Sequence, residues 1–280
     1  MQHFRAADGR MLSFRDSGGQ GPVVLCLAGL TRNARDFDSL AERLAPHRRV
    51  VRMNARGRGG SDWAKDPLAE YTIAVELGDV MALIAHLGVT RLAVIGTSRG
   101  GILGMALAAA MPGVLSGLVL NDVGAQIETK GLLAIMDYLG HPPDAPDFDA
   151  AAAALAERNA AQFPGVPLAR WVRHARAIYD DRDGRPVLAY DPALRQAVGA
   201  TLDPSLPHVD LWLMLDALAT MPVLLIRGAN SDILSAETAE RMQARLPLLT
   251  RSEIADRGHA PFLDEPSAIK AIEGFLEGIR

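Results

Sequence analysis

The stretch Gly96-Thr97-Ser98-Arg99-Gly100 decides how the rest of the chain is read. It follows the apolar run 91–95, which predicts a strand, and it opens the helical pattern of 98–111. A serine on so sharp a strand-to-helix turn projects its hydroxyl above the sheet, and the flanking positions need glycine because a side chain would collide there. The motif alone is weak, but this context indicates that Ser98 is a nucleophile. The alternative is a serine in an ordinary tight turn.

Outward from this turn, apolar runs alternate with helical patterns in both directions. Continuous apolar runs such as 23–27 are typical of strands buried on both faces, and strands that alternate with helices predict a mostly parallel sheet. We therefore expect an α/β fold with helices on both faces of the sheet. The predicted strands are 11–15, 23–27, 49–53, 91–95, 118–120, 223–226 and 250–254, and the predicted helices are 36–44, 71–87, 98–111, 236–246 and 266–279.

The segment 124–219 breaks this rhythm. It is rich in proline, contains the alanine run 150–154 and offers no convincing buried strand. Ligands of open α/β sheets bind beyond the carboxyl ends of the strands, so an insertion at this point favours a helical lid over the site. We expect a core formed by 1–123 and 220–280 and a lid formed by 124–219. Surface helices that only add bulk are the alternative.

A serine nucleophile needs a base, and the base needs an acid that orients it. Of the seven histidines, His259 has the best position, in the loop between the last predicted strand and the last predicted helix. For the acid we favour Asp232, which follows the predicted strand 223–226. Asp122 follows the preceding strand 118–120 and is the alternative, because both would lie at the correct edge of the sheet. Asp256 and Asp264 are too close to His259 in sequence.

The oxyanion that forms when Ser98 attacks a carbonyl needs two placed N–H donors. One should be the backbone N–H of Arg99, directly after the nucleophile. The other should come from the loop after the predicted strand 23–27, where Gly29 permits a close approach and the N–H of Leu30 is our candidate.

These residues resemble the α/β-hydrolase superfamily over nearly the whole chain. The matching stretches are Ala28-Gly29, the run 56–62, the run 96–100, the run 227–232 and Gly258-His259. The lid-bearing members are most similar, among them carboxylesterases, enol-lactonases and carbon–carbon bond hydrolases. The resemblance implies an enzyme that hydrolyses an acyl bond, and it does not identify the substrate.

We therefore expect a serine hydrolase that cleaves an ester, thioester or lactone of a small molecule through an acyl-serine intermediate. A carbon–carbon bond hydrolase with the same triad and a ligand-binding protein with little turnover are the alternatives. For the substrate we expect an anionic or strongly polar group, bound by Arg99 with help from Arg32, because a guanidinium can hold a carboxylate with two hydrogen bonds. Trp212 is a candidate for the apolar lining. Arg99 could instead pair with a carboxylate such as Asp36 or Asp122.

Composition limits the other partners. Lys plus Arg is 29 and Asp plus Glu is 33, which gives a formal net charge of −4 and no general attraction to nucleic acid or anionic membranes. We find no metal-ligand motif and no phosphate-binding loop, so we expect no metal and no cofactor. The single cysteine, Cys26, predicts a buried strand residue, and we expect a cytoplasmic location. The sequence gives no indication of the oligomeric state.

Overall fold

An eight-stranded sheet forms the centre of the computed structural model, which describes residues 1–202 and 210–279. The strand order is β1-β2-β4-β3-β5-β6-β9-β10. The first two strands are antiparallel to their neighbours, and all pairs from β4 to β10 are parallel. The strands are β1 (Gln2–Arg5), β2 (Met11–Asp16), β3 (Val23–Leu27), β4 (Arg49–Met53), β5 (Leu92–Thr97), β6 (Leu115–Asn121), β9 (Val223–Gly228) and β10 (Leu249–Ile254).

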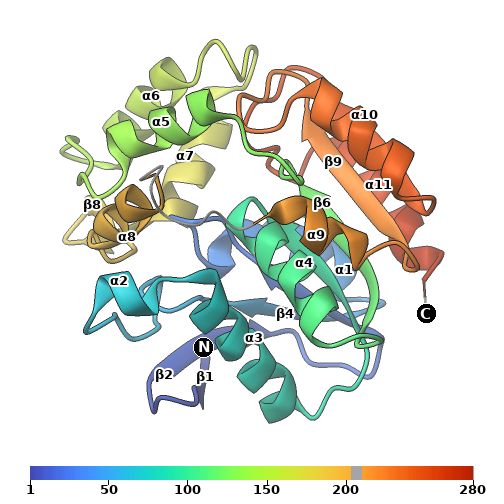
Figure 1. Cartoon of the computed structure of the whole chain (residues 1–280). Coiled ribbons are helices and arrows are strands. Elements are labelled where there is room, and N and C mark those ends of the chain that lie inside the picture. The colour runs from blue at the N-terminus through green and yellow to red at the C-terminus, as the bar shows by residue number, and fades with distance from the viewer. Residues whose placement is uncertain (203–209, 280) are drawn as a thin grey trace.

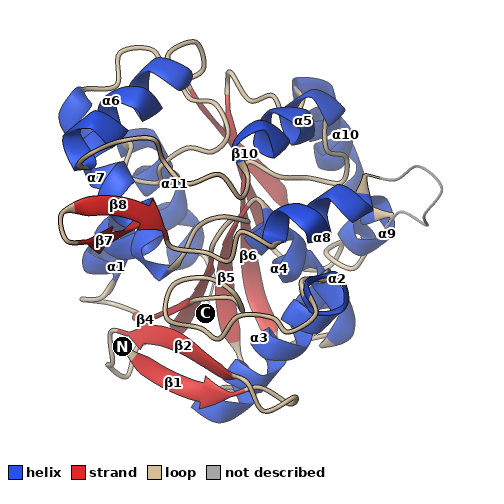
Figure 2. Ribbon diagram, turned by 90° about the vertical axis from the view of Figure 1, so that its left-hand side faces the viewer, coloured by secondary structure: helices blue, strands red, loops and turns tan. Residues whose placement is uncertain are grey.

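Helices cover both faces of this sheet, as predicted. In Figure 2, α1 (Asp38–Leu44) and α11 (Pro266–Glu277) lie on one side of the strands, and α3 (Ile73–Leu87), α4 (Arg99–Ala110) and α10 (Ala236–Arg245) lie on the other. Side chains alternate along each strand, so successive residues enter opposite layers. In β3, for example, Leu25 packs with the α3 and α4 layer, whereas Val24 and Cys26 pack with the α1 and α11 layer.

Between β6 and β9 the chain forms a second group of elements. They are α5 (Thr129–Tyr138), α6 (Phe148–Arg158), α7 (Leu168–Ile178), β7 (Tyr179–Arg182), β8 (Arg185–Leu188) and α8 (Leu194–Thr201). Figure 1 shows α5 to α8 gathered together, apart from the helices that cover the sheet. A small aromatic core with Phe163, Trp171 and Phe262 holds α6 and α7 onto the loop after β10.

Two features of the segment 124–219 differ from a purely helical lid. The antiparallel pair β7–β8 is a hairpin whose turn residues Asp183 and Gly184 both have positive φ, the preference of a tight two-residue turn. At the other end, α9 (Leu211–Asp216) packs on α4, and Leu215 and Leu218 are buried in the main core. The segment therefore contains elements remote from the sheet and a final helix that packs with the core.

Candidate active site

Ser98 occupies the turn between β5 and α4 that the sequence predicts. Its backbone has φ 51° and ψ −118°, a conformation that is rare for a residue with a side chain. The flanking glycines are required by space: a Cβ at Gly100 would lie 2.0 Å from the carbonyl oxygen of Leu27, and one at Gly96 would lie 2.5 Å from the backbone of Gly100. The helix can pass this close to the neighbouring strand β3 only without these side chains.

Ser98 and His259 are brought together at the carboxyl edge of the sheet. The Oγ of Ser98 lies 3.0 Å from Nε2 of His259, and Nδ1 of the same ring lies 2.8 Å from Oδ2 of Asp122. Asp122 also receives the Gly228 N–H at 2.8 Å and the Ser231 hydroxyl at 2.6 Å. With these donors around the carboxylate, the ring proton belongs on Nδ1, which leaves Nε2 free to accept the proton of Ser98.

The partner of His259 is therefore Asp122, and the prediction of Asp232 for that place is wrong. Both residues follow parallel strands at the same edge, so spacing alone could not separate them. Asp122 directly follows β6 with φ 55°, and its side chain is fully buried under the imidazole. The carboxylate of Asp232 instead receives a hydrogen bond of 2.6 Å from the side chain of Gln162.

Gln162 is a residue that sequence reasoning missed. It lies in the loop after α6, and its Oε1 receives the backbone N–H of His259 at 3.3 Å. Its carbonyl receives the Asn230 side chain at 3.1 Å. Gln162 thus connects the loop after α6 with the loops after β9 and β10. The sequence does not single out Gln162, because a lone glutamine in a region of irregular composition belongs to no motif.

The two predicted oxyanion donors belong to segments that adjoin Ser98. The N–H of Arg99 belongs to the first turn of α4, whose N–H groups have no acceptor within the helix. Leu30 lines a cavity of 30 Å³ together with Gly29, Ser98 and His259. Gly29 lies beside the nucleophile, since a Cβ there would be in ordinary van der Waals contact with the Cβ of Ser98, at 3.7 Å. This arrangement leaves room for a carbonyl oxygen beside the nucleophile.

The side chain of Arg99 does not enter this cavity, contrary to our expectation for substrate binding. Its Nε donates to Glu76 at 2.6 Å, and its terminal nitrogen donates to the Tyr71 carbonyl at 3.0 Å. The carboxylate that pairs with it is therefore neither Asp36 nor Asp122. Glu76 is buried on α3, where arginines from the loop after β4 and from the start of α4 reach it.

Glu76 also accepts a hydrogen bond of 2.7 Å from NH1 of Arg58, and Nε of Arg58 donates to the carbonyl of Leu30 at 2.8 Å. Burial acts to raise the pKa of Glu76, but the two guanidinium groups outweigh it and hold the pKa below its usual value. Arg99, Glu76 and Arg58 thus form a buried ionic chain, the Glu76 bridge, between the residue after the nucleophile and the oxyanion loop.

Trp212 is also absent from the cavities near Ser98, contrary to our expectation. It lies on α9, where the guanidinium carbon of Arg241 stacks over its ring at 4.6 Å from the centroid. The helix α9 packs on α4, and Trp212 packs against the main core. Trp212 therefore packs against arginines of α10 and does not line the cavity, and the prediction that places it in the substrate pocket is wrong.

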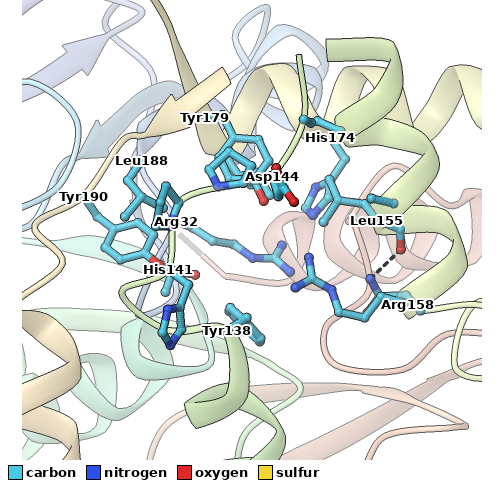
Figure 3. A pocket seen from close by; sticks show the side chains of 18 of the residues that line it. Arg32, Tyr138, His141, Asp144, Leu155, Arg158, His174, Tyr179, Leu188 and Tyr190 are labelled. Carbon is cyan, nitrogen blue, oxygen red and sulfur yellow. Dashed lines mark hydrogen bonds between the residues drawn. The ribbon is translucent and has the colours of Figure 1, made fainter. Parts of the chain in front are cut away.

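A larger cavity of 410 Å³ adjoins the one at Ser98, and His259, Thr31, Arg32 and Tyr138 line both. Figure 3 shows Arg32 and Arg158 reaching into it from opposite sides, with Tyr138, Tyr179, His174 and Tyr190 around them. Its volume is in the range that binds small molecules. Arg32 is the one predicted substrate-binding side chain that lies in this cavity.

Other chemistry is limited within the described residues 1–202 and 210–279. They contain no group of three or more His, Cys, Asp or Glu side chains placed to hold a metal ion. Over the same ranges, no helix has the length and apolar character needed to cross a membrane. Cys26 is buried in β3, and this burial raises the pKa of its thiol to about 12, so the sulfur is not a nucleophile at neutral pH.

Comparison with known proteins defines the class. Residues 22–266 match the family model described as alpha/beta hydrolase fold. The chain therefore belongs to the α/β-hydrolase fold family and is a hydrolase.

The chain is also similar to particular known proteins. The 3-hydroxybutyrate-oligomer hydrolase of Cupriavidus necator is 34% identical over 262 residues, which cover 91% of this chain and 88% of that protein. A crystal structure of an α/β hydrolase from Novosphingobium aromaticivorans is 42% identical with a TM-score of 0.90, covering 99% of this chain and 97% of that one. The structure of E-2-(acetamidomethylene)succinate hydrolase is 26% identical with a TM-score of 0.81 and covers 99% of both chains. An enzyme of that name from Mesorhizobium japonicum, 2-(acetamidomethylene)succinate hydrolase, is 27% identical over 265 residues, covering 92% of this chain and 89% of that protein.

Proposed function

We propose that this hydrolase cleaves a carboxylic ester of a small molecule through an acyl-Ser98 intermediate. The observation that carries the proposal is the continuous hydrogen-bonded chain Ser98–His259–Asp122 beside a cavity. A serine hydroxyl is a poor nucleophile at neutral pH, and this chain supplies both the base and the carboxylate that orients the base.

In the proposed reaction, Oγ of Ser98 attacks the ester carbonyl while Nε2 of His259 takes its proton. Asp122 stabilises the imidazolium and keeps the ring oriented. The oxyanion accepts hydrogen bonds from the N–H groups of Leu30 and Arg99. His259 then returns the proton to the departing alcohol. Water, deprotonated by His259, attacks the acyl-serine, and the second collapse releases the acid and restores Ser98.

Esters of short hydroxy acids are the first substrates that we propose. The similarity to 3-hydroxybutyrate-oligomer hydrolase supports them, because an oligomer of a hydroxy acid is joined by ester bonds. We propose the segment from α5 to α8 as the lid that shapes the pocket. The partner is then a small molecule, and the reaction needs no metal or organic cofactor.

A fluorophosphonate probe followed by mass spectrometry tests the nucleophile, and a panel of esters, thioesters, lactones and diketones tests the reaction. We expect labelling at Ser98 and hydrolysis of esters, with turnover reduced about 10⁶-fold in Ser98→Ala. Cleavage of diketones in preference to esters would assign carbon–carbon bond hydrolysis. Absence of both labelling and turnover in the folded protein would assign a binding protein.

A further inference from the structure

Two arginines, Arg32 and Arg158, line the 410 Å³ cavity, and among residues 1–202 and 210–279 no carboxylate forms an ion pair with Arg158. Figure 3 shows the guanidinium groups of Arg32 and Arg158 pointing toward one another from opposite walls. Two like charges that face each other repel unless an anion lies between them. We infer that Arg158 and Arg32 form a carboxylate-binding subsite, so that the substrates are esters that carry a free carboxylate. This inference rests on the proposed ester hydrolysis.

Arg158 is the cavity arginine whose charge is available to bind an anion. It comes from the last residue of α6, and its guanidinium lies over the Tyr138 ring, 5.2 Å from the centroid. Its guanidinium also lies close enough to Tyr179 to oppose the burial that raises the pKa of that hydroxyl. Within residues 1–202 and 210–279, no carboxylate forms an ion pair with it. Two aromatic residues therefore hold the position of Arg158 without neutralising its charge.

Arg32 places the subsite next to the reacting atoms. It lies in the loop after β3 that also carries Leu30, and it lines both the large cavity and the small cavity at Ser98. The carboxylate of Asp36 accepts a hydrogen bond of 3.1 Å from NH1 of Arg32 and so fixes the Arg32 side chain. The other N–H donors of the Arg32 guanidinium can still bind a ligand. A ligand held between Arg32 and Arg158 therefore has its other end beside Ser98.

The charges around the cavity agree with this assignment. His174, buried in the same wall, has a pKa well below its usual value, first because of burial and then because of Arg32, Arg170 and Arg158. A neutral imidazole adds no competing charge there. Two acidic residues, Asp137 and Asp144, also line the cavity, but both are exposed and neither pairs with Arg158 in the described part of the chain.

Pairs of esters that differ only in a carboxylate and its amide test the inference. Monomethyl glutarate and methyl 5-amino-5-oxopentanoate place the group in the acyl part, whereas 3-acetoxybutanoate and 3-acetoxybutanamide place it in the alcohol part. We expect kcat/KM to favour the carboxylate by about tenfold or more in one of the two pairs, as for the loss of a charge-assisted hydrogen bond. The pair with the larger ratio identifies which part of the ester occupies the large cavity.

The variants are Arg158→Gln and Arg32→Gln, with Arg173→Gln as the matched control. Arg173 lies on α7 outside the cavity, its side chain is 63% exposed, and its one carboxylate neighbour, Asp264, is 3.9 Å away. We expect each cavity variant to reduce the ratio of carboxylate to amide kcat/KM about tenfold, mainly through KM, and Arg173→Gln to keep the wild-type ratio. Arg158→Lys should recover part of the ratio because the charge is retained.

A binding measurement separates this inference from the proposed reaction. Calorimetric titration of Ser98→Ala with monomethyl glutarate or 3-acetoxybutanoate should show binding that Arg158→Gln weakens in the double variant. Such binding in a protein that hydrolyses no ester would retain the subsite and reject the reaction. Ester hydrolysis by the wild type with equal kcat/KM for acid and amide in both pairs would overturn the subsite, and so would an equal loss for both members of each pair in Arg158→Gln.

Discussion

At the scale of single residues, Ser98 and Asp122 occupy equivalent positions after two neighbouring strands. Each directly follows a strand of the pair β5–β6, whose last rung joins Thr97 to Asn121, and each has a positive φ, 51° and 55°. The Ser98 N–H donates to the Asn121 carbonyl at 3.0 Å, so the two turns are bonded to each other. The register of two neighbouring strands therefore fixes both ends of the triad.

Replacement of Asp122 by Asn should reduce kcat far more than replacement of Asp232 by Asn. An amide cannot hold the imidazole in the required tautomer or stabilise the imidazolium, and the equivalent change in another triad lowers turnover about 10⁴-fold. Asp232→Asn is the matched control, since this residue contacts Gln162 instead of the ring. Steady-state kinetics on one ester rank the two, and a larger loss in Asp232→Asn would reject Asp122 as the orienting acid.

The site also shows where residue-level prediction stops. The meeting of Ser98 and His259 at the edge of the sheet could be predicted, because a strained turn and a terminal loop histidine each have a recognisable local pattern. The acid could not, because the choice between Asp122 and Asp232 depends on how two loops turn after adjacent strands. Arg158 and Gln162 gave no signal, since their roles come from the packing of α6 against the core.

At the scale of elements, the close packing of α4 against β3 depends on Gly100. Gly100→Ala should strongly destabilise the protein because its Cβ would meet backbone atoms, which cannot rotate away. Gly78→Ala is the control: it lies within α3, and its Cβ would meet nothing within 4 Å. There we expect a gain of about 0.5–1 kcal/mol, because alanine favours a helix interior. Urea unfolding measures both changes, and a Gly100→Ala variant as stable as the wild type would contradict the packing argument.

The Glu76 bridge leads to a second prediction at the scale of helices and loops. Glu76→Gln leaves the buried Arg58 and the partly buried Arg99 with one neutral partner, and removal of one member of a buried ionic network costs about 3–5 kcal/mol. We also expect lower kcat in the folded variant, because the bridge holds the loop that carries Leu30. Glu240→Gln on the exposed side of α10 is the control. If urea unfolding gave the same free energy for both variants, the bridge would not stabilise these elements.

At the scale of the whole molecule, an ionic cluster fastens the first two strands to the rest of the fold. Arg10 binds Glu70 through two hydrogen bonds of 2.6 and 2.7 Å, and the buried Arg56 binds Asp79 in the same way while contacting Asp8 and Glu70. Arg10 is the main cause that lowers the pKa of Glu70 to about 2.

This cluster should make stability depend on pH in the acid range. A lowered pKa means that the stabilisation is complete above the unfolded value near 4.5 and is lost as the pH falls toward 2. The difference in free energy of unfolding between the wild type and Glu70→Gln should therefore be largest above pH 5 and should narrow between pH 5 and pH 3. Urea unfolding at a series of pH values measures it, and a constant difference would show that Glu70 does not contribute through its charge.

The architecture was predictable on this scale because the parallel strands are continuous apolar runs and the helices between them have clear periodicity. Strand β1 was missed since only one of its four residues is buried. The hairpin β7–β8 was missed for the same reason, because only one of its eight residues is buried. The packing of α9 on α4 arises from contacts distant in sequence, which no local pattern encodes.

In the proposed mechanism, the position of His259 determines when the protein first becomes reactive. Ser98 and Asp122 are set by strands that pair with each other, but the imidazole comes from a loop 137 residues after Asp122. A nascent chain emerging from the ribosome can therefore assemble β5 and β6 while Ser98 remains inert, because no base is present to take its proton. Reactivity toward a fluorophosphonate would begin only when the loop after β10 docks. Covalent labelling during synthesis would thus report the completion of the fold and leave every earlier intermediate unmarked.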